Sequence, residues 1–210
     1  MSNILLIGSL ATMLMFTGSL SADSVKPVEV REVTLEADME IYENLKAIEE
    51  EAVMVIVGEA TPHAENFVEY ESDGTVREFA TKRTIKIKKI MKDASEKGFK
   101  VGDEIILHEP NAVVKRNGEE LRYMKEGYQL MEDGKQYVLF LNPGYVYKED
   151  WVLTSYIQGK YDLNPEDQKK TNSISKKLKE QTDERVIKLN SNIQNQLFKK
   201  YAKELKEVTD

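Results

Sequence analysis

The chain of 210 residues contains no cysteine, only two histidines and a single tryptophan. Without cysteine there are no disulfide bonds, no thiol nucleophiles, no thiolate-bound metal ions and no lipidated N-terminal cysteine. An oxidising compartment permits disulfides without requiring them, so the absence of cysteine is compatible with export. Apolar residues make up 40% of the chain, which suits a domain that buries its core without covalent staples.

The net charge of −7 is unevenly distributed along the chain. Residues 1–22 carry no charged side chain, residues 164–210 carry 11 basic and 8 acidic ones, and the central residues 23–163 carry 19 basic and 29 acidic ones. An acidic central region repels phosphate backbones, so nucleic acid is not an expected partner. The mildly basic C-terminal segment is the only part of the chain that favours an anionic surface.

Residues 1–22 have the pattern of a secretory signal. An apolar stretch covers residues 3–16, small residues follow, and the polar chain begins at Asp23, which predicts cleavage after Ala22 or Ser21. No lysine or arginine precedes the apolar stretch, so an uncleaved membrane anchor stays open as the alternative, because an uncharged run of about 20 residues just spans a bilayer. The predicted location is secreted or associated with the cell envelope.

The mature chain reads as mainly β with helices at its two ends. Residues 23–37 lack periodicity and are interpreted as a linker or an edge extension. An amphipathic helix is predicted from the N-cap Asp38 to Glu51. Apolar or alternating runs separated by Gly, Asn and Asp turns predict five main strands and one hairpin, at residues 52–57, 75–91, 104–108, 113–123 (the hairpin), 136–141 and 152–157.

This inventory predicts a β+α fold with a small OB-like antiparallel barrel in residues 38–163, including the leading helix. Residues 164–210 are predicted to be helical. Asn164 followed by Pro165 is a helix start, and residues 183–208 carry one apolar stripe over about 25 positions. Three docking surfaces stay open for this amphipathic helix: the barrel, a partner helix, and a membrane or wall surface. Because the barrel pattern is complete by Gly159, truncation after Asp162 is predicted to leave a folded barrel.

The order of segments resembles a family. A helix is followed by AVMVIVGEA at 52–60, TIKIKKIMK at 84–92, KVGDEII at 100–106, DGKQYVLFL at 133–141 and IQGKY at 157–161. This pattern is similar to exported Gram-positive bacterial proteins of unknown function with a small OB-like (netrin/TIMP-like) β-barrel domain. The resemblance covers residues 38–163 and implies a fold and an exported location, and it implies no mechanism. Inhibition of the TIMP type needs an N-terminal cysteine, which this chain lacks.

The two histidines are the main candidates for catalysis. His63 and His108, with Glu65 or Glu109, supply possible metal ligands, but their spacing matches no compact metal-binding motif. No serine lies in a Gly-x-Ser-x-Gly turn. We therefore assign no catalytic, cofactor or metal residues, and an extracellular hydrolase, possibly metal-dependent through His63 and His108, is the alternative function.

Aromatic residues point to binding instead. Seven of the ten tyrosines and the only tryptophan lie within residues 123–161. Tyr145, Tyr147 and Trp151 flank an Asn-Pro-Gly turn beside charged residues, which predicts exposed rings in a loop. The predicted function is an exported, non-catalytic module that binds a protein, peptide or glycan at the cell envelope, with these three residues as the ligand-binding set.

Overall fold

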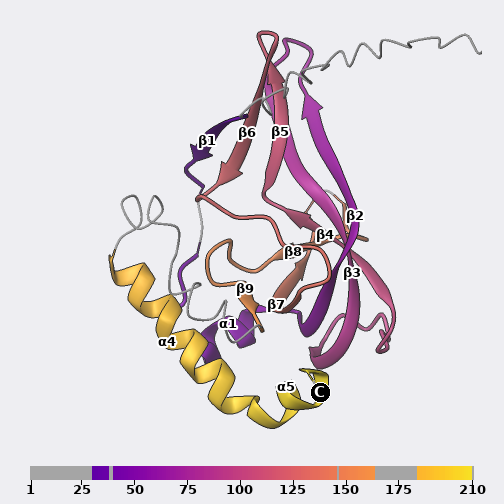
Figure 1. Ribbon diagram of the computed structural model, residues 1–210, viewed down its shortest axis with the longest axis vertical. Coiled ribbons are helices and arrows are strands. Elements are labelled where there is room, and N and C mark those ends of the chain that lie inside the picture. The colour runs from indigo at the N-terminus through magenta and orange to yellow at the C-terminus, as the bar shows by residue number, and fades with distance from the viewer. Residues whose placement is uncertain (1–29, 38–39, 146, 164–183, 210) are drawn as a thin grey trace, which may run out of the picture.

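The computed structural model describes residues 30–37, 40–145, 147–163 and 184–209. The predicted signal at residues 1–22 and the predicted helix start at Asn164 lie outside the described residues. More of the described chain is strand than helix, and the helices gather at one end of the molecule (Figure 1).

Five strands form a nearly closed ring in the middle of the molecule. They are β2 (Met54–Tyr70), β3 (Val76–Asp93), β4 (Glu104–Glu109), β8 (Trp151–Leu153) and β7 (Gln136–Pro143), in that order, and β7 pairs back with β2. Neighbours are antiparallel except β4 and β8, which are parallel. The expectation of an antiparallel arrangement is therefore wrong, because a closed ring with an odd number of strands must contain at least one parallel pair.

The predicted last strand is shorter than expected. Residues 152–157 were expected to form one strand, but β8 ends at Leu153 and residues 154–159 turn back. The chain then forms β9 (Lys160–Asp162), which the sequence pattern did not indicate. Both short strands lie on the same edge of β7: β8 pairs with its end and β9 with its beginning.

A second, three-stranded sheet lies beside the far end of the β2–β3 hairpin (Figure 1). It consists of β1 (Arg31–Leu35), β6 (Glu119–Lys125) and β5 (Asn111–Arg116). The β5–β6 hairpin was predicted from its Asn-Gly turn and is confirmed. Residues 31–35 pair in parallel with β6 at the edge of this sheet, so of the two interpretations of residues 23–37 the linker is wrong there and the edge extension is right.

Helix α1 (Leu45–Glu51) is shorter than predicted. The Oδ1 atom of Asn44 accepts a hydrogen bond from the Ala47 N–H at 3.0 Å, so Asn44 is the N-cap of this helix, and the predicted cap Asp38 lies outside the described residues. The helix buries Leu45 and Ile48 against the ring.

The first part of β2, Met54 to Gly58, and residues 137–141 of β7 are buried on both faces, as their continuous apolar runs predicted. Along β2, Met54 and Ile56 belong to the core inside the ring, whereas Val55 and Val57 face the helices. The packing at Gly58 is tight: a Cβ there would collide with the Cγ2 atom of Ile85. These two strands therefore join two cores, one within the ring and one between the ring and the helices.

The C-terminal segment docks within its own chain. It forms α4 (Glu184–Lys200) and α5 (Ala202–Thr209) in place of the single helix predicted for 183–208. Ile193, Leu197 and Leu205 are buried in the core shared with α1 and the outer face of β7. The Lys200 ammonium lies 2.7 Å from a carboxylate oxygen of Glu49, which ties the end of α4 to α1. The predicted boundary at residue 164 therefore does not separate two cores.

No helix in the described ranges is both long and apolar enough to span a membrane.

Candidate functional site

A cavity of about 310 Å³ lies beside the loop that joins β7 to β8. Its lining combines tyrosines with charged side chains and a histidine: Tyr42, Tyr145, Tyr147, Tyr156, Glu40, Glu51, Glu78, Lys125 and His108. These residues come from α1 and the segment before it, from β3, β4 and β6, and from the loops on both sides of β8. The ring and the three-stranded sheet thus both contribute to one concave site.

The β7–β8 loop is held in a compact form by its backbone. The Gly144 N–H donates to the Asp150 carbonyl and the Asp150 N–H donates to the Tyr147 carbonyl, both at 2.9 Å. A Cβ on residue 144 would lie 2.6 Å from the Tyr147 carbonyl oxygen, so this position requires glycine. The loop therefore presents its aromatic residues from a defined backbone.

Tyr147 is pinned to the β2–β3 hairpin. Its ring packs edge-to-face on Phe67 at 5.5 Å between centroids, and the Lys82 ammonium lies 4.3 Å from its centre. Its hydroxyl donates to Glu69 Oε1, and that hydrogen bond raises the pKa of Tyr147. One face of Tyr147 is thus committed to the fold while the residue lines the cavity.

His108, in the cavity wall, forms a histidine–carboxylate pair with Asp150. The Nε2 atom of His108 lies 2.8 Å from Asp150 Oδ2, and the Lys82 ammonium lies 3.5 Å from the same oxygen. A histidine oriented by a carboxylate is one half of a general-base arrangement. Among the described residues, no hydrogen bond joins His108 to a serine or threonine hydroxyl, and the hydroxyl of Thr154 in the cavity wall is buried without a hydrogen-bond partner.

A second group of lining residues, which we call the acidic end of the cavity, consists of Glu40, Glu51, Tyr42 and Tyr145. Tyr42 is only 7% exposed and its hydroxyl lies 3.4 Å from Glu40 Oε2. Burial, with the nearby charges of Glu40 and Glu51, raises the pKa of Tyr42 to about 12. Tyr145 makes the smallest contribution to this shift, and its side chain, which also lines the cavity, is 95% exposed.

The three predicted binding residues have different positions. Tyr145 and Tyr147 line the cavity, and their binding role stays a prediction. The expectation that Trp151 is exposed is wrong: it is 1% exposed and packs 5.9 Å from the Phe99 ring inside the core. Alternation along β8 turns Trp151 and Leu153 inward, and this overrides the charged residues that precede Trp151 in the sequence.

Sequence reasoning missed the other side chains of the cavity. Tyr42, Glu40 and Glu51 precede the β7–β8 loop by about a hundred residues, and Tyr156 lies in the turn after β8. Nothing local in the sequence links these positions. The only available signal was the concentration of tyrosines near the loop.

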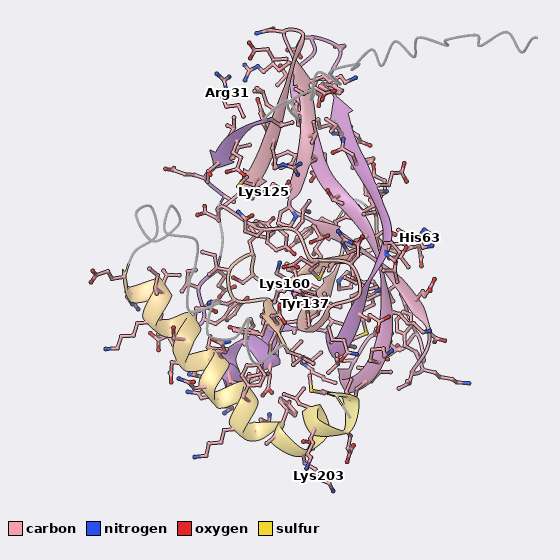
Figure 2. The ribbon with its side chains drawn as sticks, viewed as in Figure 1. Arg31, His63, Lys125, Tyr137, Lys160 and Lys203 are labelled. Carbon is pink, nitrogen blue, oxygen red and sulfur yellow. The ribbon has the colours of Figure 1, made fainter. Side chains whose placement is uncertain are left out.

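The two histidines do not share a site. His63 is exposed on an irregular stretch of β2, at the outer edge of the molecule (Figure 2), and it does not line the cavity that contains His108. Across the described ranges, no group of three or more His, Asp or Glu side chains is placed to hold a metal ion. A metal site that uses both histidines therefore has no geometric basis among these residues.

Glu109, the other carboxylate considered beside His108, is committed to the core. It is fully buried and accepts hydrogen bonds from Arg83 Nε at 2.6 Å, the Met131 N–H at 2.7 Å and the Tyr128 hydroxyl at 3.0 Å. Arg83 also pairs with Asp133 at 2.6 Å. This network is a structural element of the ring interior.

In comparisons with known proteins, no protein-family model, no curated protein and no solved structure matches the chain. The argument for function therefore depends on the geometry of the cavity.

Proposed function

We propose that this protein is an exported, non-catalytic module that binds a protein segment, peptide or glycan at the cell envelope, with the tyrosine-lined cavity as its binding site. The observation that carries the proposal is the cavity itself. Its volume of about 310 Å³ falls at the lower end of the range of ligand sites, roughly 300–1,000 Å³. Its tyrosines offer apolar faces together with polar hydroxyls, a combination suited to binding.

The finer description of the fold belongs to the same proposal. We interpret the five-stranded ring as an OB-like barrel, as the resemblance to exported Gram-positive proteins implies. Domains of this type bind ligands on a barrel face and through the loops that join their strands. The β7–β8 loop with Tyr145 and Tyr147 has such a position. This support is an analogy of fold, and the cavity is the physical argument.

The experiment compares the mature chain with two variants on an array of envelope-derived peptides and glycans. Tyr145→Ala/Tyr156→Ala removes two cavity rings, whereas Val101→Ala removes an exposed apolar side chain from a turn outside the cavity. The proposal predicts a ligand that the wild type and Val101→Ala retain and the double variant loses. Equal retention by all three proteins would contradict it.

A hydrolase is the second candidate, because His108 and Asp150 form a close pair in the cavity wall. In such an enzyme Asp150 would orient the imidazole and His108 would accept a proton. Turnover of ester or peptide substrates by the mature chain, abolished in Asp150→Asn with the fold intact, would favour this candidate over the binding module.

A further inference from the structure

The acidic end of the cavity suggests which ligand it takes, if the proposed binding function holds. We propose that this end binds the cationic side chain of a lysine or arginine in a peptide. Two carboxylates, Glu40 and Glu51, and two tyrosines, Tyr42 and Tyr145, would surround that side chain.

The first argument is charge. Glu78, the third carboxylate of the lining, lies 3.8 Å from the Lys125 ammonium and is neutralised by it. Glu40 and Glu51 have no ion pair with any residue that the structure describes. Both side chains are exposed and line the cavity, so both carboxylates are accessible to a cation bound there. The excess of ten acidic residues in the segment 23–163 adds a long-range field that attracts cations.

The second argument is the aromatic surface. An ammonium or guanidinium group is attracted to the face of a tyrosine ring when it lies within about 6 Å of the ring centre. Tyr145 is 95% exposed, so one whole side of its ring is open to such a contact. The same chemistry is already used elsewhere in this cavity, where Lys82 lies over Tyr147 and Lys125 over Tyr156.

The third argument separates a peptide from a sugar. A sugar ring needs several hydrogen-bonding groups arranged around its hydroxyls. Here Asn142 Oδ1 already accepts from the Val53 N–H, and the ring of His108 is held by Asp150. Glu40 and Glu51 can accept hydrogen bonds from sugar hydroxyls, but a neutral sugar leaves both negative charges uncompensated, whereas an aliphatic stem that ends in one cation pairs with them. A basic peptide therefore fits better than a glycan.

The test measures binding of a fluorescein-labelled pentalysine to the full mature chain by fluorescence anisotropy at low ionic strength. Glu40→Gln/Glu51→Gln removes both carboxylates, and Glu36→Gln/Glu104→Gln makes the same change of net charge at exposed positions outside the cavity. We expect the dissociation constant to rise about tenfold or more in the first variant, the loss typical of a charge-assisted contact. The second variant should change it by less than about twofold.

Two further probes distinguish the other outcomes. Pentalysine acetylated on every Nζ atom lacks the cations and should not bind, so equal binding of this peptide would overturn the inference. A glucosamine oligomer carries ammonium groups on a sugar, and if it bound while pentalysine did not, the site would be a glycan site. Equal losses of pentalysine affinity in the two glutamine variants would also overturn the inference. The proposed function would still be tested separately by Tyr145→Ala/Tyr156→Ala.

Discussion

The side chain of Asn66 forms two hydrogen bonds with the backbone of Val113: its Oδ1 atom accepts from the Val113 N–H at 2.6 Å and its Nδ2 atom donates to the Val113 carbonyl at 2.9 Å. Two residues further along β5, the Tyr70 hydroxyl lies 3.2 Å from the Lys115 N atom and 3.3 Å from its carbonyl oxygen. Side chains of β2 thus satisfy the outer edge of β5 where no backbone ladder exists. Without these side chains, the edge of β5 would expose backbone groups that can pair with a strand of another chain.

Asn66→Ala is expected to destabilise the protein by about 1 kcal/mol, because both bonds are at the surface, and to promote self-association through β5. Chemical denaturation measures the first effect and sedimentation velocity the second. Ser72→Ala, in the exposed β2–β3 turn, is the matched control and should change neither. A monomeric Asn66→Ala variant with unchanged stability would show that the two Asn66 hydrogen bonds neither stabilise the fold nor protect the edge of β5.

The sequence predicted those parts of the fold that depend on local patterns. The runs at 52–57 and 136–141 marked strands with two buried faces, and the Asp-Gly and Asn-Gly turns marked hairpins. It left β1 open as an edge extension without its bounds or its parallel partner, which lies about 90 residues away, and it did not predict β9, which has only three residues. Neither leaves a periodic signal, since each depends on what it packs against.

The candidate site was predictable to the same degree. Tyr145 and Tyr147 were identified because they alternate beside a turn, and both line the cavity. Trp151 was misassigned because its charged neighbours suggested a surface, whereas its position in β8 directs the ring inward. Glu40 and Glu51 were beyond reach, because only the tertiary structure brings them to this loop.

The contrast between Tyr145 and Trp151 can be measured as stability. Trp151→Ala should cost about 3–5 kcal/mol of unfolding free energy, as expected for loss of a buried aromatic ring, while Tyr145→Ala should stay within about 0.5 kcal/mol of the wild type. Trp151→Phe should cost less than Trp151→Ala, since it keeps a ring and removes an indole N–H that is buried without a partner. Urea denaturation checks all three, and similar costs for the two alanine variants would contradict the assigned burial.

The pH dependence of stability should report on Lys160, which lies beside Tyr137 at the centre of the molecule (Figure 2). Its ammonium donates to the Gln129 carbonyl, and burial lowers its pKa from 10.5 to about 8. Between these values the unfolded chain binds a proton that the folded chain does not, so the unfolding free energy rises with pH over this window. Tyr137, whose pKa is raised to about 12, acts in the opposite direction above about pH 10.

Comparison with Lys160→Met isolates this contribution, because Tyr137 is present in both proteins. The wild type should gain stability relative to the variant between about pH 8 and about pH 10, as measured by urea denaturation at each pH. Parallel pH profiles for the two proteins would mean that Lys160 keeps its proton throughout this range.

The C-terminal helices should be required for stability. Leu197→Ala, at a fully buried position of α4, should cost about 2–5 kcal/mol, and the exposed Lys199→Ala should be neutral. Truncation after Asp162 would uncover Val138 and Phe140 and should be much more damaging. A truncated chain that stays folded with a somewhat lower melting temperature would instead support the prediction from the sequence pattern that the barrel folds without the helices.

The Arg83–Glu109 pair provides the sharpest test of the ring interior, because both side chains are at most 5% exposed. Glu109→Gln keeps the size of the side chain but leaves the Arg83 guanidinium without its buried counter-charge, and its amide cannot satisfy every donor that converges on Glu109. We expect a loss of about 3–5 kcal/mol.

Asp133→Asn alters the other partner of Arg83, whose carboxylate is 58% exposed, so it should cost no more than about 1 kcal/mol. The double variant Arg83→Met/Glu109→Gln should be less destabilised than the sum of its single changes, since removing the arginine relieves the unpaired charge. Additive losses in this double-mutant cycle would mean that the two side chains stabilise the ring independently, through their separate contacts with Thr61, Tyr128 and Met131.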